Sequence, residues 1–199
     1  MNRLLIIMIT IGIGACTKAD QDKLKDYIEY GLESREFVRW TKEQPITWDH
    51  FTAAPNGRGI YYNYYGIYFF WTKDSVLQFN ATVYFDKGKS WVKPKSEWGD
   101  ADIIYDQVPK LLKLKFDYYE YVARQLRKQL SETGHNLNEE DMRPLIQTYY
   151  DKAENEWKAI QDDLNCDYSD SKLEPIRLMI DMRLEELKDF DSSINSVFK

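Results

Sequence analysis

The sequence is poor in cysteine and histidine and has no cluster of basic residues. It carries two cysteines, two histidines, 27 lysines and arginines, and 33 aspartates and glutamates. An acidic chain of this kind lacks the positive footprint of a nucleic-acid-binding protein, so no nucleic-acid partner is expected. Internal repeats, low-complexity tracts and apolar runs long enough to span a bilayer are also missing. These absences favour one globular domain, which we expect over residues 25–199.

The first fifteen residues have the pattern of a secretion signal. Arg3 is followed by an apolar stretch at residues 4–13, which is far too short to cross a bilayer but suits the apolar region of a signal peptide. Gly14-Ala15-Cys16 at the end of this stretch resembles the lipobox of bacterial lipoproteins. The small residues before the cysteine would let a peptidase approach closely.

This resemblance implies that residues 1–15 are removed and that lipid is attached to Cys16, leaving residues 16–24 as a polar tether. Two or three acyl chains hold a protein at a membrane far more firmly than one. Thr17 is similar to the residue after the cysteine in outer-membrane lipoproteins, so we expect a lipid-anchored protein of the cell envelope on either face of the outer membrane. The alternative, a buried N-terminal helix with an incidental cysteine, is disfavoured because nothing amphipathic precedes Asp20.

The second cysteine, Cys166, has no intramolecular partner once Cys16 carries lipid. We interpret it as a half-buried small hydrophobic residue. A catalytic cysteine would need a nearby base, and the only histidines are His50 and His135. Each histidine follows a turn signal and is interpreted as a surface residue rather than a ligand.

Aromatic and β-branched residues dominate the first half of the mature chain and predict strands. The candidates are Phe37–Trp40, Gly59–Trp71 and Val76–Phe85, with a polar hairpin loop at Thr72–Ser75. A short helix is expected before them, because Leu24, Tyr27, Ile28 and Leu32 repeat at helical spacing.

The second half of the chain predicts three longer helices. One begins after the N-cap Asp106 and runs about 25 residues, ending at residues 131–134. The next begins at Asn138, and the last begins at Ser171, which with Glu174 forms a capping-box signature. The predicted fold class is therefore α+β: a small antiparallel sheet within roughly residues 37–92, followed by a bundle of three longer helices.

Three stretches of the chain occur in a recognisable order. They are Pro45–Phe51, then Phe85–Val92 with its Ser-Trp-Val ending, then the helical Phe116–Lys128. In order and chemistry they resemble a bacterial family catalogued as a domain of unknown function and described as predicted secreted zinc-dependent proteases. The resemblance covers roughly residues 40–190.

The zinc motif of that family is missing from this sequence. In the family, the motif His-Glu-x-x-His directly precedes the Phe-Asp pair. Its two histidines are four residues apart, so they lie on one face of the helix and can bind one zinc ion. The resemblance places the histidines at Leu111 and Lys115, the glutamate at Leu112 and a further histidine near Asp170. The two leucines offer no lone pair and the lysine is cationic. We therefore expect no metal, no cofactor and no catalytic residue of the protease type.

Three charged residues of the same helix carry the remaining site hypotheses. Asp117 and Glu120 are possible pocket carboxylates, although a solvated helix face with Glu120 paired to Arg124 is the simpler interpretation. Lys115 falls on the apolar stripe, where a lysine usually needs a partner for its amine. One hypothesis is that its ammonium occupies the space of the lost metal and pairs with Asp170 or Asp167; the alternative is a lysine that reaches out to water.

The sequence supports three hypotheses about function. The first is a lipid-anchored envelope protein with a degenerate protease-like scaffold, which binds a protein or glycan of the envelope, without catalysis, in the cleft where relatives of that family hold zinc. The second is a hydrolase with a rebuilt site, in which Asp117, Glu120 and Asp170 converge in a pocket for acid–base work or a metal. The third is an assembly partner whose helices dock to another envelope component through an apolar patch.

Overall fold

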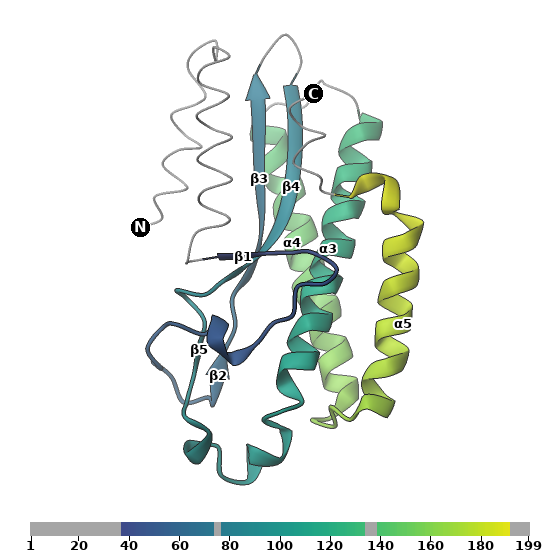
Figure 1. Ribbon diagram of the computed structural model, residues 1–199. Coiled ribbons are helices and arrows are strands. Elements are labelled where there is room, and N and C mark those ends of the chain that lie inside the picture. The colour runs from purple at the N-terminus through teal and green to yellow at the C-terminus, as the bar shows by residue number, and fades with distance from the viewer. Residues whose placement is uncertain (1–36, 74–76, 134–138, 192–199) are drawn as a thin grey trace.

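The computed structural model describes residues 37–73, 77–133 and 139–191 (Figure 1). The signal segment with Cys16, the expected first helix and His135 lie outside the described residues. Small antiparallel sheets are followed by three longer helices that pack together, so the fold is α+β as predicted. None of the helices in the described part is long and apolar enough to cross a membrane.

The strands form two sheets rather than the single sheet predicted. One sheet has the order β1-β4-β3 and the other pairs β2 with β5, all antiparallel. The strand bounds are β1 Phe37–Arg39, β2 Tyr61–Tyr62, β3 Tyr65–Lys73, β4 Leu77–Asp86 and β5 Trp91–Val92.

The predicted strand Gly59–Trp71 is broken because Tyr64 leaves the regular pairing. Its backbone N–H donates to the Ser90 hydroxyl at 3.0 Å, and its carbonyl accepts from the Asp86 N–H at 2.9 Å. The residues before this break pair with β5, and those after it pair with β4. A side-chain hydroxyl thus takes the place of a strand neighbour, which alternation in the sequence does not reveal.

Strand β4 is buried on both faces at its C-terminal end. Ala81, Val83 and Phe85 are fully buried within the main core, toward α3. Tyr84 points to the other face, because side chains alternate along a strand. Its ring lies over Gly66, where any side chain would collide with it. A glycine is therefore required at this point of β3.

The three helices are α3 Val108–Thr133, α4 Glu139–Leu164 and α5 Asp170–Glu186. The bounds of α3 and α4 lie close to those predicted. Helix α5 begins before the predicted start, because Ser169 is its N-cap. The backbone carbonyl of Ser169 accepts hydrogen bonds from the N–H groups of Lys172 and Leu173, each at 3.0 Å. The capping-box interpretation of Ser171 was wrong.

Helix α3 is the centre of the molecule. It packs against the sheet on one side and against α4 and α5 on others (Figure 1). Because α3 is covered nearly all round, it buries the charged residues Glu120 and Arg124 as well as apolar side chains. Its buried apolar residues are Val108, Leu111, Leu112, Leu114, Phe116, Tyr118, Tyr119, Val122, Ala123 and Leu126.

The described residues also form the short 3-10 turns η2 Trp48–His50, η3 Lys95–Glu97, η4 Gly99–Ile104 and η5 Lys188–Phe190. Trp48 of η2 is the centre of an aromatic cluster. Its ring lies 4.9–6.0 Å, centroid to centroid, from the rings of Phe51, Tyr61, Trp98 and Tyr105. This cluster joins the small β2–β5 sheet to the chain that leads into α3.

Candidate functional site

The positions that correspond to the zinc motif are part of the hydrophobic core. Leu111 and Leu112 are each 2% exposed. The carbonyl of Leu112 accepts a hydrogen bond of 2.9 Å from the Tyr65 hydroxyl, which fixes this turn of α3 against β3. Two buried leucines cannot ligate zinc, which needs nitrogen, sulfur or carboxylate ligands. Among the residues the structure describes, no three His, Cys, Asp or Glu side chains are grouped to hold a metal ion.

Lys115, the third position of the motif, points inward. Its side chain is 12% exposed, and its Nζ lies 3.7 Å from Glu154 Oε1 and 3.4 Å from Asn63 Oδ1. The same atom lies 5.2 Å from the ring centroid of Tyr65 and 5.5 Å from that of Tyr119, within the range of a cation–π contact. Burial lowers the pKa of Lys115, and the carboxylate of Glu154 opposes part of this shift.

The carboxylate beside Lys115 is not one of those expected. Asp170 pairs instead with Lys110 at 2.6 Å on the surface, and Asp167 accepts the backbone N–H of Ser169 at 3.1 Å. Of the two alternatives that the sequence left open, the structure therefore has the inward Lys115, but the predicted partners Asp170 and Asp167 were wrong. Glu154 lies on α4, and its pairing with α3 follows from helix packing rather than from any local motif.

Glu120 is not on a solvated face. It is fully buried and forms ion pairs with Arg124, at 3.0 Å, and with Arg127. The pairing with Arg124 agrees with the sequence, but the burial does not. Desolvation raises the pKa of Glu120, and the two guanidinium groups oppose that shift. The second carboxylate oxygen, Oε2, accepts no hydrogen bond from the described residues.

The two arginines attach α3 to the end of the chain's last helix. Arg124 donates to the Leu184 carbonyl at 2.8 Å and pairs with Asp191 at 3.0 Å. Arg127 donates to the carbonyls of Phe190, at 2.5 Å, and of Ala81 in β4. Each of these three backbone carbonyls thus accepts a hydrogen bond from an arginine side chain. The Glu120 cluster therefore holds elements together, and Glu120 itself lines neither of the two hollows described below.

Asp117 points in a different direction from Glu120. Its Oδ1 accepts hydrogen bonds from Trp40 Nε1, at 2.7 Å, and from Lys113. Burial raises the pKa of Asp117, Lys113 and Trp40 oppose the shift, and the nearby carboxylate of Asp181 adds to it. A half-buried carboxylate with a raised pKa is a feature of functional sites as well as of structural ion pairs.

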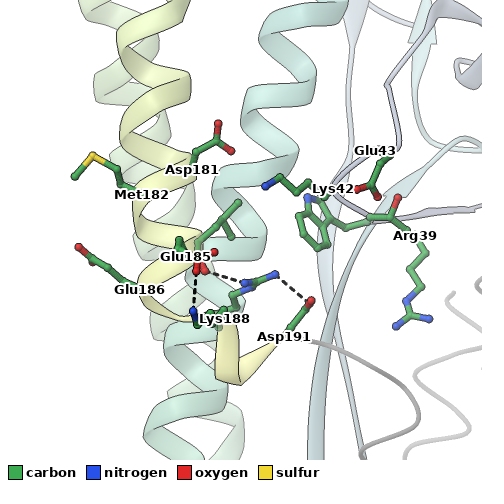
Figure 2. A pocket seen from close by; sticks show the side chains of 13 residues that line it. Arg39, Lys42, Glu43, Asp181, Met182, Glu185, Glu186, Lys188 and Asp191 are labelled. Atoms are coloured by element: carbon green, nitrogen blue, oxygen red, sulfur yellow. Dashed lines mark hydrogen bonds and ion pairs between the residues drawn. The ribbon is translucent and has the colours of Figure 1, made fainter.

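A groove runs along α5, between that helix and the segment that follows β1. Two hollows of about 1120 and 730 Å³ share Lys42, Asp181 and Leu184 in their walls and therefore adjoin. Figure 2 shows Asp181 on α5 and Lys42 after β1 on opposite sides of the larger hollow. We call the two hollows together the α5 groove.

Two of the predicted site residues, Asp117 and Asp170, line the smaller hollow of the α5 groove. Glu120 lines neither hollow, and the same is true of Leu111, Leu112 and Lys115. The groove therefore lies on the other side of α3 from the Lys115 site, and the predicted residues divide between the two places. Sequence reasoning missed Lys42 and Asp181, because no motif joins residues so far apart in the chain.

Cys166 and His50 also differ from expectation. Cys166 is exposed rather than half-buried, and its φ of 62° places it in a left-handed turn between α4 and α5. His50 is partly buried, and its Nδ1 accepts the backbone N–H of Thr47 at 3.2 Å. Burial, with a contribution from Lys87, lowers the pKa of His50 below its ordinary value.

His50 is therefore expected to make stability pH-dependent. A histidine with a lowered folded-state pKa stabilises the fold above its unfolded pKa of 6.5, and this contribution is lost as the pH falls through the lowered value. Urea unfolding from pH 7.5 to about pH 5 should show a smaller decline for His50→Gln than for the natural protein. An identical decline in both would contradict this assignment. His135→Gln, measured alongside, reveals the share of the other histidine.

A comparison of the chain with protein-family models, with curated proteins and with solved structures finds no match. The resemblance to the protease family is consequently carried by the quoted residues alone. The residues at the positions where that resemblance implies zinc ligands, Leu111, Leu112 and Lys115, do not fit a zinc ion.

Proposed function

We propose that this chain is a lipid-anchored protein of the bacterial envelope that binds a protein or glycan in the α5 groove without catalysing a reaction. The observation that carries this proposal is the groove itself, with two adjoining hollows along one helix. The apolar character of Leu111 and Leu112 supports a non-catalytic role, because the protease-like scaffold keeps no zinc ligands at these positions.

Photo-crosslinking in cells tests the proposed binding. A photoreactive amino acid at Glu43, an exposed residue in the wall of the larger hollow, is expected to give crosslinked products. The same amino acid at Asp163, which is exposed on α4 and lines neither hollow, is the matched control. Products that are equal at both positions, or absent at both, would argue against binding in the groove.

The lipid anchor is tested by substitution of either cysteine. Cys16→Ser removes the atom that would carry the lipid, so the protein should move from the membrane fraction to the soluble fraction. Cys166→Ser is the control and should stay with the membranes, because Cys166 is an exposed thiol of the folded domain. Membrane association that survives Cys16→Ser would contradict a lipid anchor at this residue.

A hydrolase with a rebuilt carboxylate site is the second candidate. It is favoured by Asp117, which lines the smaller hollow and has a raised pKa, as a general acid needs. Hydrolysis of peptide or glycoside test substrates that Asp117→Asn abolishes would favour this candidate over the first. After incubation with excess zinc, elemental mass spectrometry should find less than about 0.1 equivalent retained, since no set of ligands is grouped for zinc among residues 37–73, 77–133 and 139–191.

A further inference from the structure

The α5 groove is longer than a small molecule needs. Its lining residues on α5 run from Asp170 to Glu186, the whole of a 17-residue helix. At about 1.5 Å per residue this is roughly 25 Å. An extended peptide rises about 3.3 Å per residue, so the groove has the length of about eight residues. The two hollows together also exceed the roughly 300–1,000 Å³ of most small-ligand pockets.

Most charged side chains in the walls of the groove are already paired. The pairs are Lys110 with Asp170 at 2.6 Å, Arg177 with Glu174 at 2.5 Å, Lys188 with Glu185 at 2.8 Å, Arg124 with Asp191 at 3.0 Å, and Lys113 with Asp117. These pairs neutralise one another within the protein. They leave little net charge to select a partner of one sign.

Lys42 and Asp181 are the unpaired charged residues at the place where the two hollows meet. Both are exposed, and neither forms an ion pair with any described residue; the same holds for Glu43 and Glu186, but these border the larger hollow only. Lys42 extends from the segment after β1 toward α5, which carries Asp181 (Figure 2). An occupant at this point therefore meets a positive charge on one wall and a negative charge on the other.

We propose that the occupant of the α5 groove is an extended peptide segment of a partner protein that carries both acidic and basic side chains. This inference rests on the proposed binding function and names its ligand. An acidic side chain of the peptide pairs with Lys42 and a basic one pairs with Asp181. A peptide of a single sign satisfies one wall and is repelled by the other, so the two residues set specificity by charge complementarity.

Fluorescence anisotropy with labelled peptides tests the inference on the lipidated protein in detergent. The probes are eight-residue peptides with Ser-Glu-Ser-Lys repeats, and matched peptides in which all charged residues are Glu or all are Lys. The mixed peptide should bind at least about fivefold more tightly than either matched peptide, as expected for exposed ion pairs, and the difference should vanish in about 1 M salt.

Charge reversal identifies the residues responsible. Lys42→Glu and Asp181→Lys should each weaken binding of the mixed peptide about fivefold or more, and the double variant, which keeps one charge of each sign, should recover it. Lys172→Glu and Asp163→Lys change exposed charges outside the groove and should leave binding unchanged. Equal binding of a single-sign peptide, or no effect of either reversal, would overturn the inference.

The peptide result and the crosslinking result separate this inference from the proposed function. Crosslinked products at Glu43 without selectivity for the mixed peptide would leave groove binding in place and refute the peptide class. The absence of both crosslinked products and peptide binding would refute the proposed function and this inference together. A crosslinked partner peptide with residues of one sign only at the contact would also refute the peptide class.

Discussion

Replacing Leu112 with glutamate is expected to lower the free energy of unfolding by about 3–4 kcal/mol at neutral pH. A fully buried carboxyl group has its pKa raised by about 3–5 units and is therefore protonated in the folded protein at pH 7, at a cost of about 1.36 kcal/mol for each of the roughly 2.7 pH units above the ordinary pKa of glutamate. Leu112 is 2% exposed and packs within the main core. Glutamate is the residue that the resemblance to the protease family implies at this position, so the variant tests whether the position can hold a carboxylate.

The loss of stability in Leu112→Glu should also depend on pH. A carboxyl group whose folded-state pKa is raised destabilises the fold most above that pKa, and the loss shrinks as the pH falls and the group is protonated. Urea unfolding followed by circular dichroism measures both effects. Leu178→Glu, at a leucine on α5 that is 54% exposed, is the control and should change stability little. Near-natural stability of Leu112→Glu would contradict the burial of this position in the core.

Replacing Glu120 with glutamine should lower the free energy of unfolding by about 3–5 kcal/mol. The variant leaves the buried Arg127 without its negative partner and Arg124 with Asp191 alone, and removal of one member of a buried ion pair has an effect of this size. The side-chain volume is almost unchanged, so the effect reports charge rather than packing. Urea unfolding at neutral pH measures it.

A second ion pair on the same helix provides the control for Glu120→Gln. Lys128 and Glu132 have the same i,i+4 spacing as Glu120 and Arg124, but both are exposed and lie 3.9 Å apart. Glu132→Gln should change stability by no more than about 1 kcal/mol. Similar losses in the two variants would show that burial does not decide the strength of these pairs.

The helices were predictable from sequence because their signals are local. The bounds of α3 and α4 lie close to those that apolar periodicity predicts, and this signal acts within a few positions; the N-cap prediction Asp106 was wrong by one residue, because the first helical N–H groups donate to the carbonyl of Gln107. The break at Tyr64 was not predictable, because it depends on the Ser90 hydroxyl 26 residues away. Long-range hydrogen bonds of this kind decide where a strand changes partners, and no periodicity records them.

The candidate site was predictable only in part. The inward position of Lys115 could be inferred from the apolar stripe, whereas its partner Glu154 depends on how α4 lies against α3. Glu120 is buried together with Arg127, and the position of Arg127 depends on backbone carbonyls of β4 and of Phe190 that lie far from it in the sequence. The α5 groove joins Lys42 to Asp181, and only the folded chain brings these residues together.

The hydrogen bonds of Arg124 and Arg127 lower the entropic cost of binding a partner along α5. The arginines hold the carbonyls of Leu184 and Phe190 against α3, so the end of the 17-residue helix α5 is in place before anything binds. Ordering a free segment on association costs about 1–2 kcal/mol of backbone entropy for each residue. Here that entropy is lost during folding, so a partner meets a wall that is already ordered, and encounter does not wait for a folding step.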